Sequence, residues 1–357
     1  MKKLLGGVLV LAILLAVVWM ARGPISLWIT DRALQRTMAA DLVEDLPDGL
    51  HAFVCGSGSP LPDPDRAGPC LAVVAGKRVF LVDAGEGAAE TLSRGQLPAG
   101  RIEGVLLTHF HSDHIDGLGA VALQRWVGAP ARTPMPLTGP QGVERVVAGL
   151  NEFYALDYGY RTAHHGAAVA PPEGAGFAAR AIAFPEGQAQ VVILDEGGLK
   201  ITAFKVDHSP VENAVGYRFD YRGRSLVVTG DTAANPNVVT ASRGADLLVH
   251  DALSPTLVAR LQKASKAAGM DGRAKIMADI PDYHASPEDA ARQAKAAGVK
   301  ALLLTHIVPP LPLKGLEVPF LGDARKLFGG KLWIARDRDL ISLPAGSDEI
   351  RRRRVGR

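Results

Sequence analysis

A short segment crowded with metal-binding side chains constrains this sequence more than any other feature. Residues 108–117 read THFHSDHIDG, so three histidines and two aspartates fall within ten residues. An apolar run at 104–107 precedes them, which predicts a loop just past the end of a β-strand. Polar groups placed there would be costly to bury without partners. We therefore predict that this segment binds metal.

Ligands of the same kinds recur further along the chain, each near the end of an apolar run: His208, Asp231 and His306. Alternate residues of an extended turn point the same way, so His109 and His111 can share one ion. We predict two sites, one made of His109, His111 and His208, the other of Asp113, His114 and His306, with Asp231 bridging them. Imidazole and carboxylate ligands without thiolate favour zinc, with manganese or iron as alternatives.

The apolar runs also predict the fold class. Strands are expected at 78–82, 104–107, 201–206, 225–228 and 301–304, and each run is followed by a polar residue. A helix is expected at 287–297, because Ser286 suits its N-cap, Pro287 its first position and Gly298 its end. Strands and helices mixed along one span predict a layered α/β fold.

Composition excludes several classes of protein. Hydrophobic residues make up 47% of the 357 positions and charged residues 22%, which is ordinary globular usage. Two cysteines are too few for a disulfide-stapled miniprotein or a four-cysteine zinc finger. Without the five arginines of the C-terminal tail, Lys and Arg fall from 40 to 35 against 37 Asp and Glu. The body is therefore near neutral and lacks the basic footprint expected of an RNA-binding protein.

The order of these residues resembles a known family. His-x-His-x-Asp-His followed by His, Asp and His is the pattern of the metallo-β-lactamase superfamily. The segments at 56–60, 83–86 and 284–288 resemble its ribonuclease Z-like branch, and the likeness spans residues 53–343. The resemblance implies an αββα sandwich with two divalent ions, most simply Zn²⁺, at one edge between the sheets.

The resemblance also implies roles for individual residues. It places the two metals on the ligands named above, with Asp113 and His284 as the catalytic candidates. His284 would stabilise an oxyanion or protonate the leaving group, unless it is an ordinary histidine at a helix start. Asp83 would orient a ligand histidine, unless it only caps a turn.

One departure from the branch directs our choice of substrate. Members that process transfer RNA carry a long arm between the third histidine and the bridging aspartate, whereas His208 and Asp231 are 23 positions apart here. The layout is similar to arylsulfatase-like members. We therefore predict a hydrolase of small sulfate esters that uses a metal-bridging hydroxide, and we expect no nucleic-acid partner. A phosphodiesterase or ribonuclease Z-type endonuclease is the alternative, followed by a lactonase or thioesterase.

The N-terminus predicts export. Residues 4–20 are apolar and uncharged and follow Lys2 and Lys3, a pattern between a signal peptide and a short membrane helix. We predict an uncleaved membrane anchor over 1–23, a juxtamembrane helix or linker over 24–50, the main domain over 51–345 and a disordered Arg-rich tail over 346–357. The lysines would hold the main domain in the periplasm. Release into the periplasm after signal cleavage is the alternative, and the oligomeric state stays open, a homodimer included.

Two further groups of residues have weaker assignments. Arg161, His164 and His165 lie among aromatic residues between the first two ligand segments, which suggests a substrate wall or a plain surface helix. Cys55 and Cys70 flank a Gly- and Pro-rich loop. In an oxidising compartment they would form a disulfide if their strands pair, and they would otherwise be buried free thiols.

Overall fold

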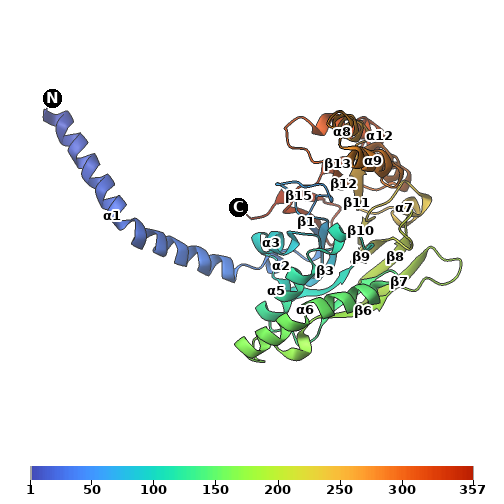
Figure 1. The fold of residues 1–357 in the computed structure, drawn as a ribbon, viewed down its shortest axis with the longest axis horizontal. Coiled ribbons are helices and arrows are strands. Elements are labelled where there is room, and N and C mark those ends of the chain that lie inside the picture. Colours follow the sequence, from blue (N-terminus) through green and yellow to red (C-terminus); the bar gives the residue numbers. More distant parts are fainter. Residues whose placement is uncertain (1, 357) are drawn as a thin grey trace. The chain divides into compact units, whose positions relative to one another are not determined.

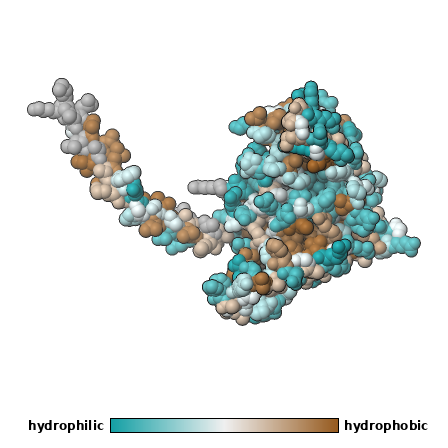
Figure 2. Space-filling view, in the orientation of Figure 1, coloured by the Kyte–Doolittle hydropathy of each residue, from teal (hydrophilic) through white to brown (hydrophobic). Residues whose placement is uncertain are grey.

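The computed structural model describes residues 2–356, which divide into an N-terminal unit that ends at Leu42 and a body that begins at Val43 (Figure 1). The N-terminal unit is built on the helix α1 (Lys2–Ala39), which continues through Pro24. The helix therefore does not end where the predicted anchor ends. Large apolar side chains such as Leu15, Trp19 and Met20 are exposed along it (Figure 2).

The predicted membrane anchor is not supported. Across the part of the chain that the structure describes, no helix combines the length and the apolar character that a bilayer crossing requires. The anchor predicted over 1–23, and the membrane attachment that followed from it, are therefore left without support. The side chains of Lys2 and Lys3, from which we predicted the orientation, lie outside the described residues.

Two β-sheets form the centre of the body. The first contains β1 (Gly49–Gly56), β2 (Cys70–Ala75), β3 (Arg78–Val82), β4 (Ile102–Leu106), β5 (Met135–Gly139), β6 (Phe177–Ala181), β14 (Asp339–Pro344) and β15 (Arg351–Arg354). Its order is β15-β14-β1-β2-β3-β4-β5-β6. The second contains β7 (Gln190–Glu196), β8 (Leu199–Lys205), β9 (Val215–Tyr221), β10 (Arg224–Val228), β11 (Leu247–Leu253), β12 (Ala301–Val308) and β13 (Lys331–Ile334). Its order is β13-β12-β11-β10-β9-β8-β7.

The sheets pack face to face, and helices cover their outer faces (Figure 1). The inner core joins Leu50, Val73 and Phe80 of the first sheet to Tyr217 and Leu303 of the second. The longer helices are α3 (Ala88–Arg94), α5 (Leu118–Gly128), α6 (Val143–His165), α8 (Pro255–Ala267), α9 (Asp271–Asp279) and α10 (Pro287–Ala297). Shorter ones are α2 (Leu42–Asp45), α4 (Ser112–Ile115), α7 (Pro236–Ala241), α11 (Glu317–Leu321) and α12 (Ala324–Phe328). The prediction of a layered α/β fold is confirmed.

The C-terminal tail differs from its prediction. We expected 346–357 to be disordered, but Arg351–Arg354 form β15, which pairs antiparallel with β14. Arg352 donates to the Asp339 carboxylate at 2.6 Å and to the Ile334 carbonyl at 3.1 Å. These partners are distant in sequence, which is why a run of arginines gave no sign of a strand.

Candidate metal centre

The histidine-rich segment lies directly after β4 and turns into α4. Two glycines let this turn approach the loop after β3. A Cβ added at Gly85 would lie 2.2 Å from the carbonyl oxygen of Asp113, and one at Gly117 would lie 2.0 Å from that of Gly85. No side chain fits in either place. The backbone itself therefore holds the segment against the first sheet.

The seven predicted ligands come together in one cluster. Ligand atoms of His109, His111 and His208 lie within 4.8 Å of one another, and so do those of Asp113, His114 and His306. His109 and His111 lie on the loop after β4, and His208 follows β8. Asp113 and His114 lie in α4, and His306 belongs to β12. The cluster lies where ends of both sheets meet.

Asp231, which follows β10, reaches both groups. Its Oδ2 lies 3.0 Å from His306 Nε2, 3.2 Å from His114 Nε2 and 4.0 Å from His109 Nε2. All of these side chains are buried. A carboxylate in this place can bridge two ions.

The residues fit a pair of divalent ions. Asp231 Oδ1 is buried and has no hydrogen-bond partner among the described residues. Nε2 of His109 lies 2.9 Å from Nδ1 of His111, and only one of these two nitrogens can donate a hydrogen bond to the other. Buried polar groups are normally satisfied. Divalent cations would satisfy this inward-facing set.

The local electrostatics favour neutral imidazoles on one side of the cluster. Burial, with His114 nearby, holds the pKa of His109 well below its ordinary value. Burial also lowers the pKa of His208. Burial alone would likewise lower the pKa of His114, but the carboxylates of Asp231 and Asp83 outweigh it and raise that pKa. Negative charge is therefore concentrated around His114 and Asp231.

Asp83 contacts a ligand histidine, as a positioning residue would. It follows β3, and its Oδ2 accepts hydrogen bonds from His114 Nδ1 and from the Thr108 hydroxyl, each at 2.8 Å. Its Oδ1 accepts from the Thr108 backbone N–H at 2.8 Å. On the other side, His208 Nδ1 donates to the Tyr283 carbonyl at 2.9 Å. These contacts leave Nε2 of both histidines directed at the cluster.

His284 borders the cluster from another direction. Its ring stacks on His306 with centroids 5.2 Å apart and lies 5.1 Å from the ring of His208. Its Nδ1 lies 3.0 Å from the Asp251 carboxylate. Burial alone would raise the pKa of Asp251, but hydrogen bonding by His250 and His284 outweighs it and lowers that pKa.

Sequence reasoning missed Asp251, although a signal for it exists. Asp251 follows the apolar start of β11, as the predicted ligands follow theirs, but His250 beside it is the more conspicuous residue. His250 is fully buried, and its Nε2 lies 3.0 Å from Gln293 Oε1. These contacts give His250 a structural role.

His306 also differs from its prediction, because it lies within β12 and not on a loop after it. Thr305 pairs with Asp251 and Ile307 pairs with Ala252, so His306 is an extra residue in the ladder. Its φ of 46° is the mark of that bulge. Bulges are often found beside active sites, where they redirect a side chain.

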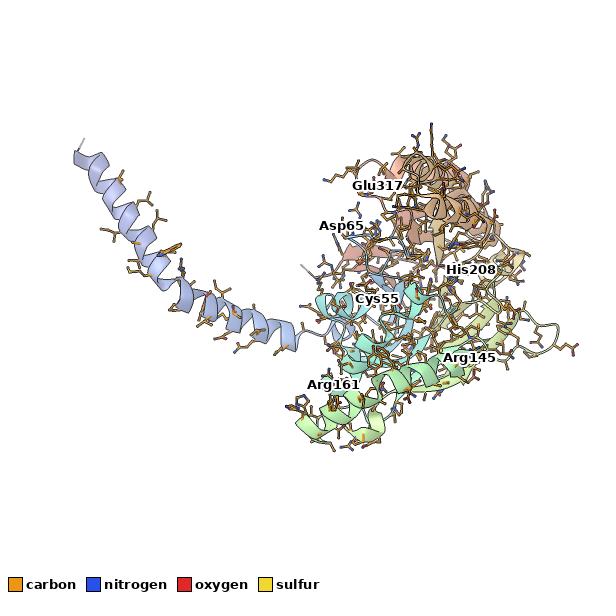
Figure 3. The ribbon with its side chains drawn as sticks, viewed as in Figure 1. Cys55, Asp65, Arg145, Arg161, His208 and Glu317 are labelled. Atoms are coloured by element: carbon orange, nitrogen blue, oxygen red, sulfur yellow. A yellow bond between two sulfur atoms is a disulfide. The ribbon has the colours of Figure 1, made fainter. Side chains whose placement is uncertain are left out.

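The predicted substrate wall does not lie beside the cluster. Arg161 is on α6, far from His208 (Figure 3), and its Nε donates to Asp157 at 2.7 Å. His164 and His165 are exposed at the end of the same helix. The reason is that α6 packs on β5 and β6 at the outer face of the first sheet.

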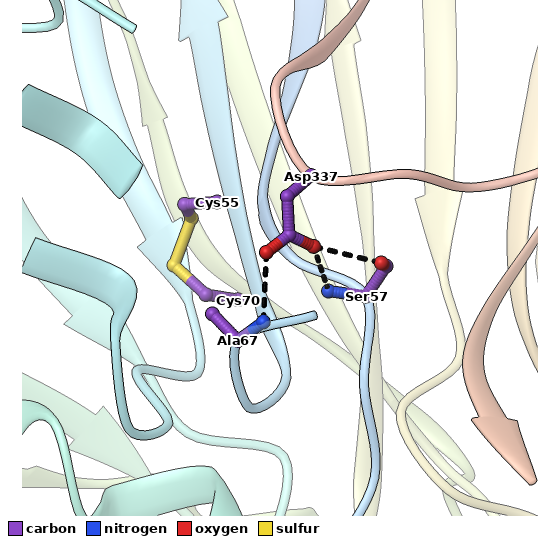
Figure 4. Close-up of a disulfide and its surroundings, with 5 residues drawn as sticks. All are labelled: Cys55, Ser57, Ala67, Cys70 and Asp337. Carbon is purple, nitrogen blue, oxygen red and sulfur yellow. Dashed lines mark hydrogen bonds between the residues drawn. A yellow bond between two sulfur atoms is a disulfide. The ribbon is translucent and has the colours of Figure 1, made fainter. Parts of the chain in front are cut away.

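The loop between β1 and β2 is fixed at both ends. Cys55 and Cys70 form a disulfide at its base (Figure 4). The Asp337 carboxylate accepts hydrogen bonds from the Ser57 N–H at 3.0 Å, the Ser57 hydroxyl at 2.8 Å and the Ala67 N–H at 2.7 Å. A cavity of about 720 Å³ opens between this loop and Asp113. The loop is thus one wall of the approach to the cluster.

The segment between His208 and Asp231 is short, as predicted. It consists of the β9–β10 hairpin, in which Arg224 pairs with Tyr221. Tyr217 of β9 is fully buried, and its hydroxyl donates to the Leu107 carbonyl at 2.6 Å. The hairpin is therefore part of the core.

Comparisons with known proteins agree with this geometry. A family model described as Beta-lactamase superfamily domain matches residues 78–307. Ribonuclease Z of Mycolicibacterium paratuberculosis is 36% identical over 300 residues, which are 84% of this chain and 100% of that protein. Ribonuclease Z of Mycobacterium avium is also 36% identical over 300 residues, with the same coverage of both chains.

Solved structures show the same fold. Human tRNase Z, short form, is 21% identical with a TM-score of 0.60, and the match covers 82% of this chain and 99% of that one. The metallo-beta-lactamase fold protein YhfI of Bacillus subtilis is 22% identical with a TM-score of 0.58 and the same coverage.

These relatives correct several of the predictions. Relatives matched along their whole length are named ribonuclease Z, so the sulfate-ester hydrolase and the absence of a nucleic-acid partner are wrong, and the closeness to arylsulfatases is unsupported. They also lend no support to the periplasmic location. The error came from giving a short hairpin and a near-neutral charge more weight than the motifs. The chain belongs to the metallo-β-lactamase superfamily, in its ribonuclease Z-like branch, and is a metal-dependent hydrolase that acts on ester bonds.

Proposed function

We propose that this protein is a ribonuclease Z-type endonuclease with two zinc ions, and that it cleaves phosphodiester bonds in transfer-RNA transcripts. The carrying observation is the place of Asp231, which reaches both three-ligand groups. The names of the relatives supply the substrate class.

His109, His111 and His208 would hold one ion, and Asp113, His114 and His306 the other, with Asp231 between them. A donor set of imidazole and carboxylate favours zinc, with manganese or iron as alternatives. When bound, such ions supply Lewis acidity at the phosphate and a nucleophile from water at neutral pH.

The chain's own residues prepare this chemistry. Asp83 and the Tyr283 carbonyl fix the rings of His114 and His208, because each accepts a hydrogen bond from Nδ1. Partners of this kind orient ligands and determine which nitrogen carries the proton. Asp113 borders the cavity, where its carboxylate would help to align the attacking water.

His284 is the candidate proton donor to the leaving oxygen. With Nδ1 bonded to Asp251, its Nε2 is the nitrogen available to substrate. The Asp251 carboxylate stabilises the protonated ring, which can release its Nε2 proton to an oxygen that develops negative charge. Asp251 is thus a positioning residue that acts through His284.

The direct test is cleavage of a transfer-RNA transcript with a 3′ extension by the purified full chain with measured metal content. We expect cut RNA, together with turnover of bis(4-nitrophenyl) phosphate, and loss of both in Asp231→Asn. Arg145→Gln is the matched control, because Arg145 is an exposed residue of α6 away from the cluster (Figure 3).

The two substrates separate the parts of the proposal. If the chain turns over the small diester but cleaves no RNA, the proposed endonuclease activity is contradicted. A phosphodiesterase activity would still stand. Activity that persists in Asp231→Asn would contradict the assignment of the centre.

A further inference from the structure

A second cavity, of about 660 Å³, is lined by an unusual concentration of positive charge. Two carboxylates contribute to its wall, Asp65 and Glu317, which Figure 3 labels. Against them stand six cationic side chains: Arg66, Lys314, Arg325, Arg336, Arg352 and Arg354. We call this feature the arginine cavity.

The C-terminal arginine run explains part of this charge. Arg351–Arg354 form β15 at the edge of the first sheet, and alternate residues of a strand share one face. Arg352 and Arg354 therefore line the cavity together. Pairing to β14 places the two arginines opposite Ile341 and Asp339, so the charge is displayed by a strand and not by a loose tail.

Several of the cations lack a carboxylate partner. Within residues 2–356, none lies within ion-pair distance of Lys314, Arg325 or Arg354. The remaining cations do have carboxylates nearby: Arg66 is 3.5 Å from Asp63, Arg336 is 3.6 Å from Glu317, and Arg352 is bonded to Asp339. Like charges gathered in this way repel one another, and a bound polyanion relieves that repulsion.

Arg66 is the most telling member of the group. Its side chain is only 10% exposed, and its Nε has no hydrogen-bond partner among the described residues. A buried guanidinium nitrogen without a partner is costly. An entering anion could supply the missing acceptor.

The arginine cavity adjoins the approach to the metal centre. Asp65 and Arg66 also line the cavity of about 720 Å³ that Asp113 borders. The cavity of about 720 Å³ is acidic, with Glu86, Glu90 and Asp116 in its wall. In that wall Arg66 and Arg94 carry positive charge. A polyanion anchored at the metals would cross the loop at Asp65 and Arg66 and meet the concentrated positive charge of the arginine cavity beyond it.

We propose that the arginine cavity binds the phosphodiester backbone of the RNA strand that is cleaved at the metal centre. The inference rests on the proposed function. Arginine contacts to phosphate supply affinity without reading sequence. Such contacts suit a site that must hold the backbone of any RNA strand. The arginine cavity would bind the RNA in this protein, as the long arm does in members of the branch that carry one.

The test is RNA binding by the metal-loaded full chain, measured by fluorescence anisotropy at several salt concentrations. The probe is a fluorescein-labelled single-stranded RNA with phosphorothioate linkages, which slow its cleavage. The variants are Arg354→Gln and the double variant Arg336→Gln/Arg354→Gln, both at exposed positions. Arg145→Gln is the control, and melting temperature and bound metal verify the fold.

We expect the double variant to bind RNA about tenfold more weakly or worse, and the slope of log affinity against log salt to become shallower by roughly 0.7 for each phosphate that the variant no longer neutralises. Arg145→Gln should bind as the wild type does. A double variant with wild-type affinity for RNA and a wild-type salt slope would overturn the proposal. Vesicles of phosphatidylserine serve as a second anionic probe. A double variant that no longer binds the vesicles but still binds RNA would also overturn the proposal.

The outcomes also separate this inference from the proposed function. If the wild type cleaves RNA and the arginine variants bind RNA normally, the arginine cavity is not the RNA-binding site. The proposed endonuclease activity would still stand. If RNA binding depends on the arginines but the chain cuts no RNA, the arginine cavity is supported and the endonuclease is contradicted. A wild type that does not bind the RNA at all would overturn the inference.

Discussion

At the scale of single residues, the centre depends on acceptors that hold imidazole rings in one orientation. Asp83 holds His114, the Tyr283 carbonyl holds His208, and Asp251 holds His284, each through Nδ1. The same arrangement recurs with three different acceptors. Loss of an acceptor should therefore change how a ring works without removing the ring.

Asp251→Asn tests this idea, because the amide cannot stabilise a protonated His284 as the carboxylate does. We expect kcat for a phosphodiester to fall by about 10²-fold, within the range for a lost general acid, while KM and bound metal change little. His284→Ala should give a loss of similar size, and the double variant little more. Asp251→Glu should restore part of kcat.

A merely structural Asp251 would give a different pattern. The variant would then lose metal or melt at a lower temperature, and the losses in Asp251→Asn and His284→Ala would multiply in the double variant. Steady-state kinetics with metal analysis distinguishes the two cases.

Away from the centre, His51 predicts a pH dependence of stability. Burial is the main cause that lowers its pKa below the ordinary 6.5 in the folded state. Its stabilising contribution is therefore complete above pH 6.5 and is lost as the pH falls through the folded pKa, because the unfolded chain takes up the proton first. Urea unfolding of wild type and His51→Leu at several pH values should show the gap between them closing towards acid. A constant gap would contradict this.

At the scale of elements, the sequence predicted local secondary structure well. It predicted poorly which elements that are distant in sequence contact one another. The strand predicted at 78–82 is β3, and the helix predicted at 287–297 is α10. The helix was predictable because its signals are local. The Ser286 hydroxyl accepts from the Asp289 N–H at 3.1 Å, and the Asp289 carboxylate accepts from Ser286 in return.

Within the body, the failures at this scale concern contacts between distant parts of the chain. The aromatic residues of α6 suggested a substrate wall, but only the sheet order shows that this helix lies over β6 and away from the metals. The bulge at His306 depends on register with β11. β15 depends on pairing with β14 and on the contact between Arg352 and Asp339. A run of arginines contains no local signal for either contact.

Arg352→Ala tests whether β15 is a true part of the sheet. The change removes the 2.6 Å contact to the buried Asp339 carboxylate. Among the described residues, that carboxylate would keep its bond from the Arg336 N–H at 2.8 Å. We expect a loss of about 1–3 kcal/mol in the free energy of unfolding. Arg353→Ala, at an exposed position of the same strand, should cost less than about 0.5 kcal/mol. Equal effects in urea unfolding would mean that the Asp339 contact contributes nothing.

At the scale of the whole molecule, the proposed metal ligands join the two sheets. His109, His111, Asp113 and His114 follow a strand of the first sheet. His208 and Asp231 follow strands of the second sheet, and His306 lies in one of its strands. A ligand that binds only the folded state stabilises it by mass action. The ions should therefore stabilise the packing of the sheets as well as catalyse.

Metal removal should lower the melting temperature. We expect a fall of roughly 5 °C or more after chelation, and recovery on addition of zinc but not of calcium, which prefers oxygen ligands. Differential scanning calorimetry of the full chain measures both steps. An unchanged melting temperature in a chain verified to be metal-free would show that the sheets do not depend on the ions.

The most direct test of the central claim is a zinc titration of the metal-free full chain, with cleavage of a transfer-RNA transcript as the readout. Our assignment of His109, His111 and His208 to one ion, of Asp113, His114 and His306 to the other, and of Asp231 to both predicts cleavage that reaches its maximum at two equivalents of zinc. Asp231→Asn should show no cleavage at any ratio. Full cleavage at one equivalent, or cleavage that needs no added metal, would contradict the account.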